Sequence, residues 1–240
     1  MMPPEEVRTI PGWQLEELAS AGRENLDAAH VSKYDEKENA DAAEEVVLLT
    51  SLGLNHRSTV VDLGAGTGQF AIAVAASCAR VVAVDVSPVM LRSLRSKAAA
   101  AGTPNLEVVR AGFLTYEHSG EFPDFVYSRY ALHHLPDFWK AVALTRIHRL
   151  LRPNGIVRLW DVVYGFPPTE AGERVEAWCA VGSDDVGDGW NRAELEEHVR
   201  DENSTFTWLL EPMMQQCGFE IVDATYSDDR FFAKYLLEKR

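Results

Sequence analysis

Between residues 59 and 160 the chain alternates between short apolar runs and helical stretches, and this alternation is its strongest constraint on folding. Two valine-rich runs, Thr59–Leu63 and Arg80–Asp85, have the length of buried strands, and residues 70–78 between them have a helical pattern. Strands that alternate with helices form parallel sheets covered on both faces. We therefore expect an α/β fold, and 240 residues suit one domain with an insertion.

The same order continues to the end of the chain. Ser87 followed by Pro88 is a typical helix start. A four-residue connection at 227–230 makes the last two strands antiparallel. Beyond the first two strands and first helix, strands are expected at residues 106–110, 122–128, 156–160, 219–226 and 231–237, and helices at 42–52, 88–101, 139–150 and 209–217.

A glycine-rich loop, Gly64 to Gly68, follows the first strand and precedes a helix. Glycine permits positive φ and lets a ligand approach bare backbone, and open α/β sheets bind nucleotides at this point. A dinucleotide fingerprint needs glycine at the sixth position, which is Gln69 here, and an ATPase-type phosphate loop needs a lysine, which is absent. The loop alone fits either a nucleotide site or a plain tight turn.

The second strand ends at Asp85, where a carboxylate can accept both hydroxyl hydrogens of a ribose. Its alternative role is to cap the following helix, but Ser87 already stands at that position. A strand, a glycine loop, a helix, a second strand and a terminal acid within 26 residues favour a nucleoside-containing ligand.

These segments resemble class I S-adenosylmethionine-dependent methyltransferases of the small-molecule type, as in ubiquinone and menaquinone biosynthesis. Residues 60–70 (VVDLGAGTGQF) and 82–91 (VAVDVSPVML) are similar to the first two motifs of that family. Residues 124–135 (DFVYSRYALHHL) and 150–156 (LLRPNGI) are similar to its fourth-strand motif and the turn before the fifth strand. The resemblance implies a Rossmann-like seven-stranded sheet of order 3-2-1-4-5-7-6 with the last strand antiparallel. It also implies S-adenosyl-L-methionine as cofactor and S-adenosyl-L-homocysteine as product.

The resemblance assigns roles to individual residues. Gly64 and Gly66 would lie close to the methionine part of the cofactor, and Asp85 would hold its ribose hydroxyls. Tyr34 would fold over the cofactor, and Arg129 begins the segment beneath the methionyl group. The complete set of expected cofactor-binding residues is Tyr34, Asp62, Gly64, Ala65, Gly66, Gln69, Asp85, Val86, Met90, Gly112, Phe113 and Arg129.

The sequence departs from the family at the adenine end of the site. Family members usually place Gly-Asp after the third strand, where the acid accepts a hydrogen bond from the adenine amino group. Here the sequence is Arg110-Ala-Gly-Phe-Leu114, without an acid. Either a backbone carbonyl takes that role or the alignment is off by one residue.

Methyl transfer is an in-line displacement at a sulfonium methyl with a neutral leaving group, so the main task is to position the nucleophile. A general base is needed only where the nucleophile must lose a proton. The candidates lie after strand ends: His133 or its neighbour His134, Asp161, and Tyr164 just beyond. Each has a structural alternative as a buried, capping or ion-paired residue. No metal site is expected, because Cys/His clusters and metal triads are absent from the sequence.

Composition limits the partners and the compartment. A formal net charge of −14 argues against nucleic-acid or anionic-membrane surfaces, because phosphates require lysine or arginine. Cys78, Cys179 and Cys217 are widely separated, which suits a reducing compartment. A leader-like N-terminus and a membrane-length apolar run are both absent from the sequence. We therefore expect a cytoplasmic protein with a small-molecule substrate and no nucleic-acid or membrane partner; a homodimer is one option for its assembly.

Residues 1–40 are expected to form an N-terminal helical lid, and residues 41–240 the methyltransferase domain. Within the latter, the segment at about 165–208 breaks the alternation and holds eleven acids against three arginines. We expect a helical insertion there, either a solvated cap or a substrate lid. As a lid, its acids would attract a cationic substrate, above all Asp184, Asp185 and Asp188.

Four tryptophans, at positions 160, 178, 190 and 208, are candidates for an aromatic substrate pocket or for the core. Two other protein classes stay open. One is an S-adenosylmethionine-binding protein that does not methylate, such as a partner subunit or an enzyme of cyclisation or elimination. The other is a nicotinamide-dependent oxidoreductase.

Overall fold

A computed structural model describes residues 11–240, except 23, 32–33, 35–41 and 183–189. At its centre seven strands follow the order β3-β2-β1-β4-β5-β8-β7, and β6 pairs with β5 outside this row. β8 runs antiparallel to both of its neighbours, and the other pairs of the row are parallel. Because β6 is an additional short strand, this is the predicted order under a different numbering, and the Rossmann-like fold is confirmed.

The strands are β1 (Thr59–Leu63), β2 (Arg80–Asp85), β3 (Leu106–Arg110), β4 (Phe125–Arg129), β5 (Ile156–Tyr164), β6 (Thr205–Phe206), β7 (Phe219–Tyr226) and β8 (Phe232–Lys239). The α-helices are α1 (Ala28–Val31), α3 (Ala42–Ser51), α4 (Gln69–Ala75), α5 (Pro88–Ala101), α6 (Asp137–Leu150), α7 (Ala171–Val181), α8 (Arg192–Asp201) and α9 (Thr207–Gln216). Short 3-10 helices are η1 (Glu17–Ser20), η2 (Glu24–Leu26), η3 (Leu132–His134) and η4 (Pro168–Glu170).

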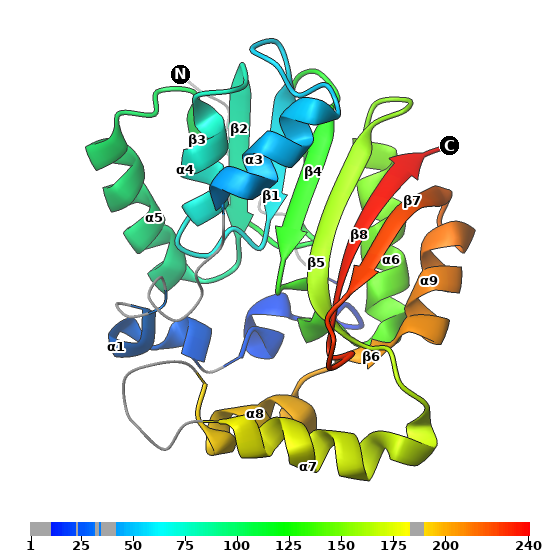
Figure 1. The fold of residues 1–240 in the computed structure, drawn as a ribbon. Helices are drawn as coiled ribbons and strands as arrows, with labels where there is room; N and C mark the ends of the chain where they lie inside the picture. Colours follow the sequence, from blue (N-terminus) through cyan, green and yellow to red (C-terminus); the bar gives the residue numbers. More distant parts are fainter. Residues whose placement is uncertain (1–10, 23, 32–33, 35–41, 183–189) are drawn as a thin grey trace.

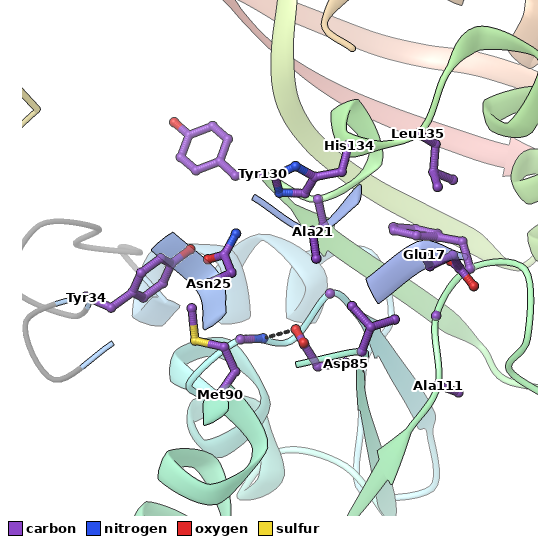
Figure 2. A pocket seen from close by; sticks show the side chains of 16 residues that line it. Glu17, Ala21, Asn25, Tyr34, Asp85, Met90, Ala111, Tyr130, His134 and Leu135 are labelled. Carbon is purple, nitrogen blue, oxygen red and sulfur yellow. Dashed lines mark hydrogen bonds between the residues drawn. The ribbon is translucent and has the colours of Figure 1, made fainter. Parts of the chain in front are cut away.

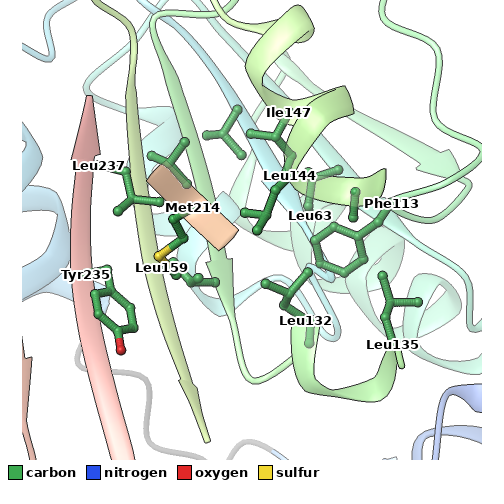
Figure 3. Packing of buried hydrophobic residues seen from close by; sticks show 14 of the residues in the cluster. Leu63, Phe113, Leu132, Leu135, Leu144, Ile147, Leu159, Met214, Tyr235 and Leu237 are labelled. Atoms are coloured by element: carbon green, nitrogen blue, oxygen red, sulfur yellow. The ribbon is translucent and has the colours of Figure 1, made fainter. Parts of the chain in front are cut away.

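Both faces of the sheet are buried, as the continuous apolar strands predicted. Successive side chains of a strand point to opposite faces, so Val60 joins the cluster under α3, α4 and α5, and Val61 joins the cluster under α6 and α9. Figure 3 shows the second cluster, in which Leu144 of α6 and Met214 of α9 lie with Leu159 of β5.

Two predicted strand boundaries differ most from the structure. β5 continues to Tyr164 rather than ending at residue 160, because the buried carboxylate of Asp161 is satisfied by backbone N–H groups and does not interrupt the strand. β4 begins at Phe125 rather than at residue 122, and Phe122 is exposed. Pro123 between them has no N–H to donate to a neighbouring strand.

The carboxyl ends of the parallel strands all lie at one edge of the sheet, and several short elements gather beyond it. Figure 1 shows η1, η2 and α1 from the N-terminal segment and α7 and α8 from the acidic segment at this edge. Two helices, α7 and α8, lie in the acidic segment. Asp184, Asp185 and Asp188 lie outside the described residues. Within the described part of the chain, the helices are too short or too polar to cross a bilayer.

A buried ion pair fastens α3 to the sheet. Arg158 of β5 donates to both carboxylate oxygens of Glu45, at 2.7 and 2.8 Å, and both residues are at most 5% exposed. We expect Glu45→Gln to lower the free energy of unfolding by about 3–5 kcal/mol, because it leaves the Arg158 charge buried without its partner. Urea denaturation measures this. The double variant Glu45→Met/Arg158→Met, which has no buried charge, should recover most of the loss; an equally unstable double variant would contradict the explanation.

Candidate active site

The glycine loop after β1 is built by backbone contacts at the carboxyl edge of the sheet. Gly64, Gly66 and Gly68 have φ of +76, +53 and +86°, which favour glycine. The N–H groups of Gly64 and Ala65 both donate to the carbonyl of Val84, at 2.9 and 3.0 Å, so the loop folds back onto β2. A Cβ on Gly64 would come within 2.3 Å of the Ala131 Cβ, so this position also has no room for a side chain.

Asp85 connects this loop to the start of α5. Its carboxylate accepts one hydrogen bond from Gly66 N at 2.8 Å and another from Ser87 N at 2.7 Å. Ser87 caps α5, since its hydroxyl accepts from Met90 N at 3.2 Å, which confirms the predicted helix start. Burial raises the pKa of Asp85, and the hydrogen bonds from Ser87 and Gly66 oppose that shift. Asp85 is therefore held rigidly by two N–H donors.

Two adjoining pockets open at this edge and share Tyr34, Gly64, Gly66 and Tyr130. Figure 2 shows the first, with Asn25, Tyr34 and Met90 on one side, Glu17 and Leu135 on the opposite side, and Asp85 and His134 between them. All twelve residues expected to contact the cofactor line one of the two. The first takes Tyr34, Gly64, Gly66, Asp85, Val86, Met90, Gly112 and Phe113, and the second adds Asp62, Ala65, Gln69 and Arg129.

Residues of the N-terminal segment line the first pocket, and the role of this segment as a lid stays a prediction. Tyr34 lies above the glycine loop: a Cβ built on Gly66 would be 3.8 Å from its ring and 4.0 Å from the sulfur of Met90. The hydroxyl of Ser87 donates to the carbonyl of Asn25 at 2.6 Å, which fixes η2 over α5. The sequence missed Glu17 and Asn25 as pocket residues, because no strand-end or loop position marked them.

Asp62 is a second buried acid near the loop, 2% exposed. Its pKa rises to about 8, first through burial and then through the charge of Asp85, while the backbone of Ala71 opposes the shift. The folded state therefore holds this proton more tightly than the unfolded chain, where the pKa is near 3.8. The contribution of this group to stability is complete below that value and is lost as the pH rises to about 8.

We expect Asp62→Asn to become more stable relative to the wild-type protein as the pH is raised from about 5 to about 8, because the amide has no charge to desolvate. Denaturation of the cofactor-free proteins at several pH values gives the difference in free energy of unfolding. Asp124→Asn, at the opposite end of the sheet, is the matched control. A difference between wild type and Asp62→Asn that stays constant across this range would contradict the expectation.

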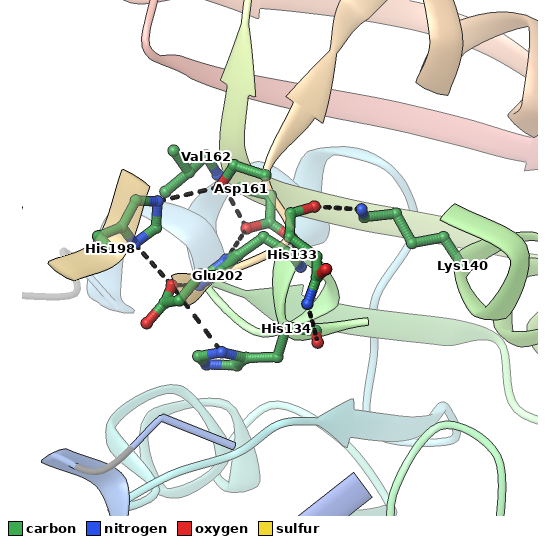
Figure 4. Close-up of polar contacts among 9 residues, drawn as sticks. His133, His134, Lys140, Asp161, Val162, His198 and Glu202 are labelled. Atoms are coloured by element: carbon green, nitrogen blue, oxygen red, sulfur yellow. Dashed lines mark hydrogen bonds and ion pairs between the residues drawn. The ribbon is translucent and has the colours of Figure 1, made fainter. Parts of the chain in front are cut away.

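The predicted catalytic residues His133 and Asp161 lie together, outside both pockets. His133 Nδ1 is 2.5 Å from one oxygen of Asp161, and His133 N donates to the other oxygen at 3.0 Å (Figure 4). On the far side, His133 Nε2 pairs with Glu202 at 2.8 Å, and His198 Nδ1 of α8 pairs with the same oxygen at 2.6 Å. Burial alone would lower the pKa of His133, but Asp161 and Glu202 raise it to about 10.

His134, the neighbour of His133, faces the first pocket. Burial and then the charge of His133 lower the pKa of His134 to about 3, so its ring is neutral at physiological pH. The segment that follows α8 also holds η3: Asn203 N donates to the carbonyl of His133 and Asn203 Nδ2 to that of His134, both at 3.1 Å. This network connects α8, the end of β5 and the wall of the pocket.

Tyr164, the third catalytic candidate, packs among Phe166, Phe206 and Phe231 at ring distances of 5.5–5.7 Å. Burial raises its pKa to about 12. It lines neither pocket, and the four tryptophans do not either. Trp178 stacks on Phe231, and the Trp160 ring contacts the cations of Arg129 and Lys234, so these two belong to packing beyond the pockets.

Comparison with known proteins identifies the domain. Residues 60–155 match the model of a family described as a methyltransferase domain. Trans-aconitate 2-methyltransferase of Methylobacterium radiotolerans is 31% identical over 128 residues, which cover 52% of this chain and 45% of that protein. The chain thus spans about half the length of that relative.

Two solved structures share the fold at low sequence identity. A SAM-dependent methyltransferase from Aquifex aeolicus has a TM-score of 0.63 at 16% identity, and the match covers 89% of this chain and 99% of that one. The [4+2]-cyclase SpnF has a TM-score of 0.61 at 16% identity, covering 82% of this chain and 80% of that one. The described chain thus has the fold of class I S-adenosylmethionine-dependent methyltransferases, and its residues 60–155 match a methyltransferase domain.

Proposed function

We propose that this protein transfers the methyl group of S-adenosylmethionine to a small organic molecule. The observation that carries the proposal is the arrangement of the twelve expected residues around two joined pockets at the carboxyl edge of the sheet. The bare backbone of Gly64 and Gly66 and the fixed carboxylate of Asp85 suit an adenosyl ligand. The relative named for trans-aconitate supports a small substrate, since trans-aconitate is a small carboxylic acid.

When bound, the cofactor would supply an electrophilic methyl group, and the chain's own contribution is binding and orientation. Asp85 places a carboxylate beside the glycine loop, where it would hold the ribose, while the buried Asp62 beside it keeps its proton up to a pH of about 8. Tyr130 and His134 border the first pocket and would contact a nucleophile that enters there. The N-terminal segment, and the cover formed by α7 and α8, would exclude water.

We expect His133 and Asp161 to act as positioning residues rather than as a general base. With both ring nitrogens next to carboxylates, His133 is protonated and does not accept a further proton. The contact between His133 and Asp161 would hold η3 in place. Because His134 is the last residue of η3, its ring would be held in place as well. Tyr164, kept protonated by burial, supports the aromatic packing at the end of β5.

Asp161→Asn is expected to lower kcat by on the order of 10- to 100-fold. The dissociation constant of S-adenosylhomocysteine should stay within about threefold, because Asp161 does not line the pockets. Steady-state kinetics and calorimetry separate the two quantities. An equal loss of turnover and cofactor affinity would mean that the residue only maintains the fold.

Product analysis tests methyl transfer itself. The protein is incubated with S-adenosylmethionine carrying a labelled methyl group and with sets of small carboxylic acids, amines and phenols. Labelled product formed in equal amount to S-adenosylhomocysteine supports the proposal. Methylthioadenosine, or conversion of an acceptor while the cofactor stays intact, would instead indicate a protein that binds S-adenosylmethionine without methylating. Tight binding of NAD and none of S-adenosylhomocysteine would indicate an oxidoreductase.

A further inference from the structure

Glu17 is a buried acid that lies against the loop after β3, although it comes from the N-terminal segment. Both of its carboxylate oxygens accept from Leu114 N, each at 3.1 Å, and the hydroxyl of Thr115 donates to one of them at 3.3 Å. Thr115 in turn accepts from Gly112 N at 2.9 Å. These donors hold the Glu17 carboxylate against the loop after β3.

Gly112 makes the space that this carboxylate occupies. A Cβ built on Gly112 would lie 2.3–2.5 Å from three atoms of the Glu17 carboxyl group. The backbone of Gly112 does not have a positive φ, so its conformation does not demand glycine. Steric room for Glu17 therefore explains the missing side chain.

Glu17 also faces the pocket at the position where a nucleobase would lie. The first pocket extends from the glycine loop past Asp85 to Ala111, Gly112 and Glu17. If Asp85 holds the ribose, the base lies beyond it, between Met90 and the 111–113 backbone. An ionised carboxylate only accepts hydrogen bonds, and the exposed edge of adenine carries an amino group that donates them.

We infer that Glu17 receives the amino group of adenine, and that the pair Glu17–Gly112 replaces the acid that the sequence lacks after the third strand. The pairing of Asp85 with Arg110 in the sheet and the bond from Ala111 N to the Asp85 carbonyl fix the start of this loop. An alignment error therefore does not explain the missing acid. Burial raises the pKa of Glu17, against the hydrogen bonds of Leu114 and Thr115, which is the environment in which a further donor is favourable.

The experiment compares two ligands in each variant, so that a general loss of folding cancels. S-adenosylhomocysteine has the 6-amino group, and S-inosylhomocysteine has an oxygen there that repels a carboxylate. Calorimetry should show that the wild-type protein prefers the amino ligand by on the order of 100-fold. In Glu17→Gln the amide can turn to donate to the oxygen, and the preference should fall below about fivefold. Glu16→Gln, one position earlier and exposed, is the matched control and should keep the wild-type preference.

Relocating the acid gives a second, independent readout. Gly112→Asp alone should bind poorly, because its side chain collides with Glu17. Glu17→Ala/Gly112→Asp should recover a preference for the amino ligand of at least about tenfold. An unchanged preference in Glu17→Gln, or no recovery in the double variant, would overturn the inference. Both outcomes leave the methyl-transfer proposal untouched as long as S-adenosylhomocysteine still binds.

Discussion

Asp85→Asn is expected to weaken binding of S-adenosylhomocysteine by on the order of 30- to 100-fold, equivalent to about 2–3 kcal/mol. The size of the effect follows from how Asp85 is held. Each of its oxygens accepts a backbone N–H, one from Gly66 and one from Ser87. An asparagine must direct its NH₂ group at one of these donors. The substitution therefore loosens the glycine loop or the start of α5, besides removing the acceptor expected to hold the ribose.

Isothermal titration with S-adenosylhomocysteine measures this, and Asp124→Asn is the control. Asp124 also accepts a backbone N–H, from Thr59 at 2.8 Å, and pairs with Arg152, but it lies at the opposite end of β1. Its amide variant should lose stability without losing ligand affinity. If the two variants weakened binding alike, the loss would reflect the sheet in general, and the role of Asp85 in the site would be wrong.

The sheet and the cofactor edge were predictable because local pattern and chain order determine them. Valine-rich strands such as β1 and β2 bury both faces and show as continuous apolar runs. The carboxyl ends of parallel strands meet at one edge, so Gly66 of the loop and Asp85, 19 positions apart in sequence, are brought together by topology alone. The hydrogen bond from Gly66 N to the Asp85 carboxylate joins the ends of the two strands in this way.

Contacts between segments distant in sequence were not predictable in this way. Glu17 reaches Leu114 across 97 positions, and Glu45 reaches Arg158 across 113. In the sequence each of these acids reads as part of a solvated helical face. The burial of these two acids depends on how the N-terminal elements pack against the sheet. A single sequence does not contain that information. The missing acid after β3 was a signal that the adenine end of the site departs from the family pattern, but it did not indicate Glu17.

The catalytic candidates show a related limit. His133 and Asp161, predicted as separate candidates, lie next to each other in the structure. Their spacing did not reveal Glu202, which comes from the end of α8 and closes the other side of the His133 ring. Asp161 and Glu202 together raise the pKa of His133 to about 10, which favours the positioning role proposed above over that of a base. The sequence located these groups correctly in the fold and could not decide their charge.

The second large effect is expected at Gly64. Gly64→Ala places a methyl group 2.3 Å from the Ala131 Cβ while the backbone has φ of +76°. The left-handed conformation costs an alanine about 1–2 kcal/mol, and crowding of packed groups adds about 1–3 kcal/mol. Because Gly64 and Ala131 both line the first pocket, movement of either one should reduce cofactor affinity together with stability.

Two further variants separate strain from crowding. Gly53 also has a positive φ, +103°, but a Cβ there meets nothing within 4 Å, so Gly53→Ala should show the backbone cost alone and leave cofactor affinity unchanged. Gly64→Ala/Ala131→Gly removes the collision and keeps the strain, so it should recover the crowding part of the loss in both thermal stability and affinity for S-adenosylhomocysteine. If the double variant were no better than Gly64→Ala, contact with Ala131 would not be what excludes a side chain from this loop. The requirement for glycine would then come from its φ angle, or from the ligand that the bare backbone is expected to approach.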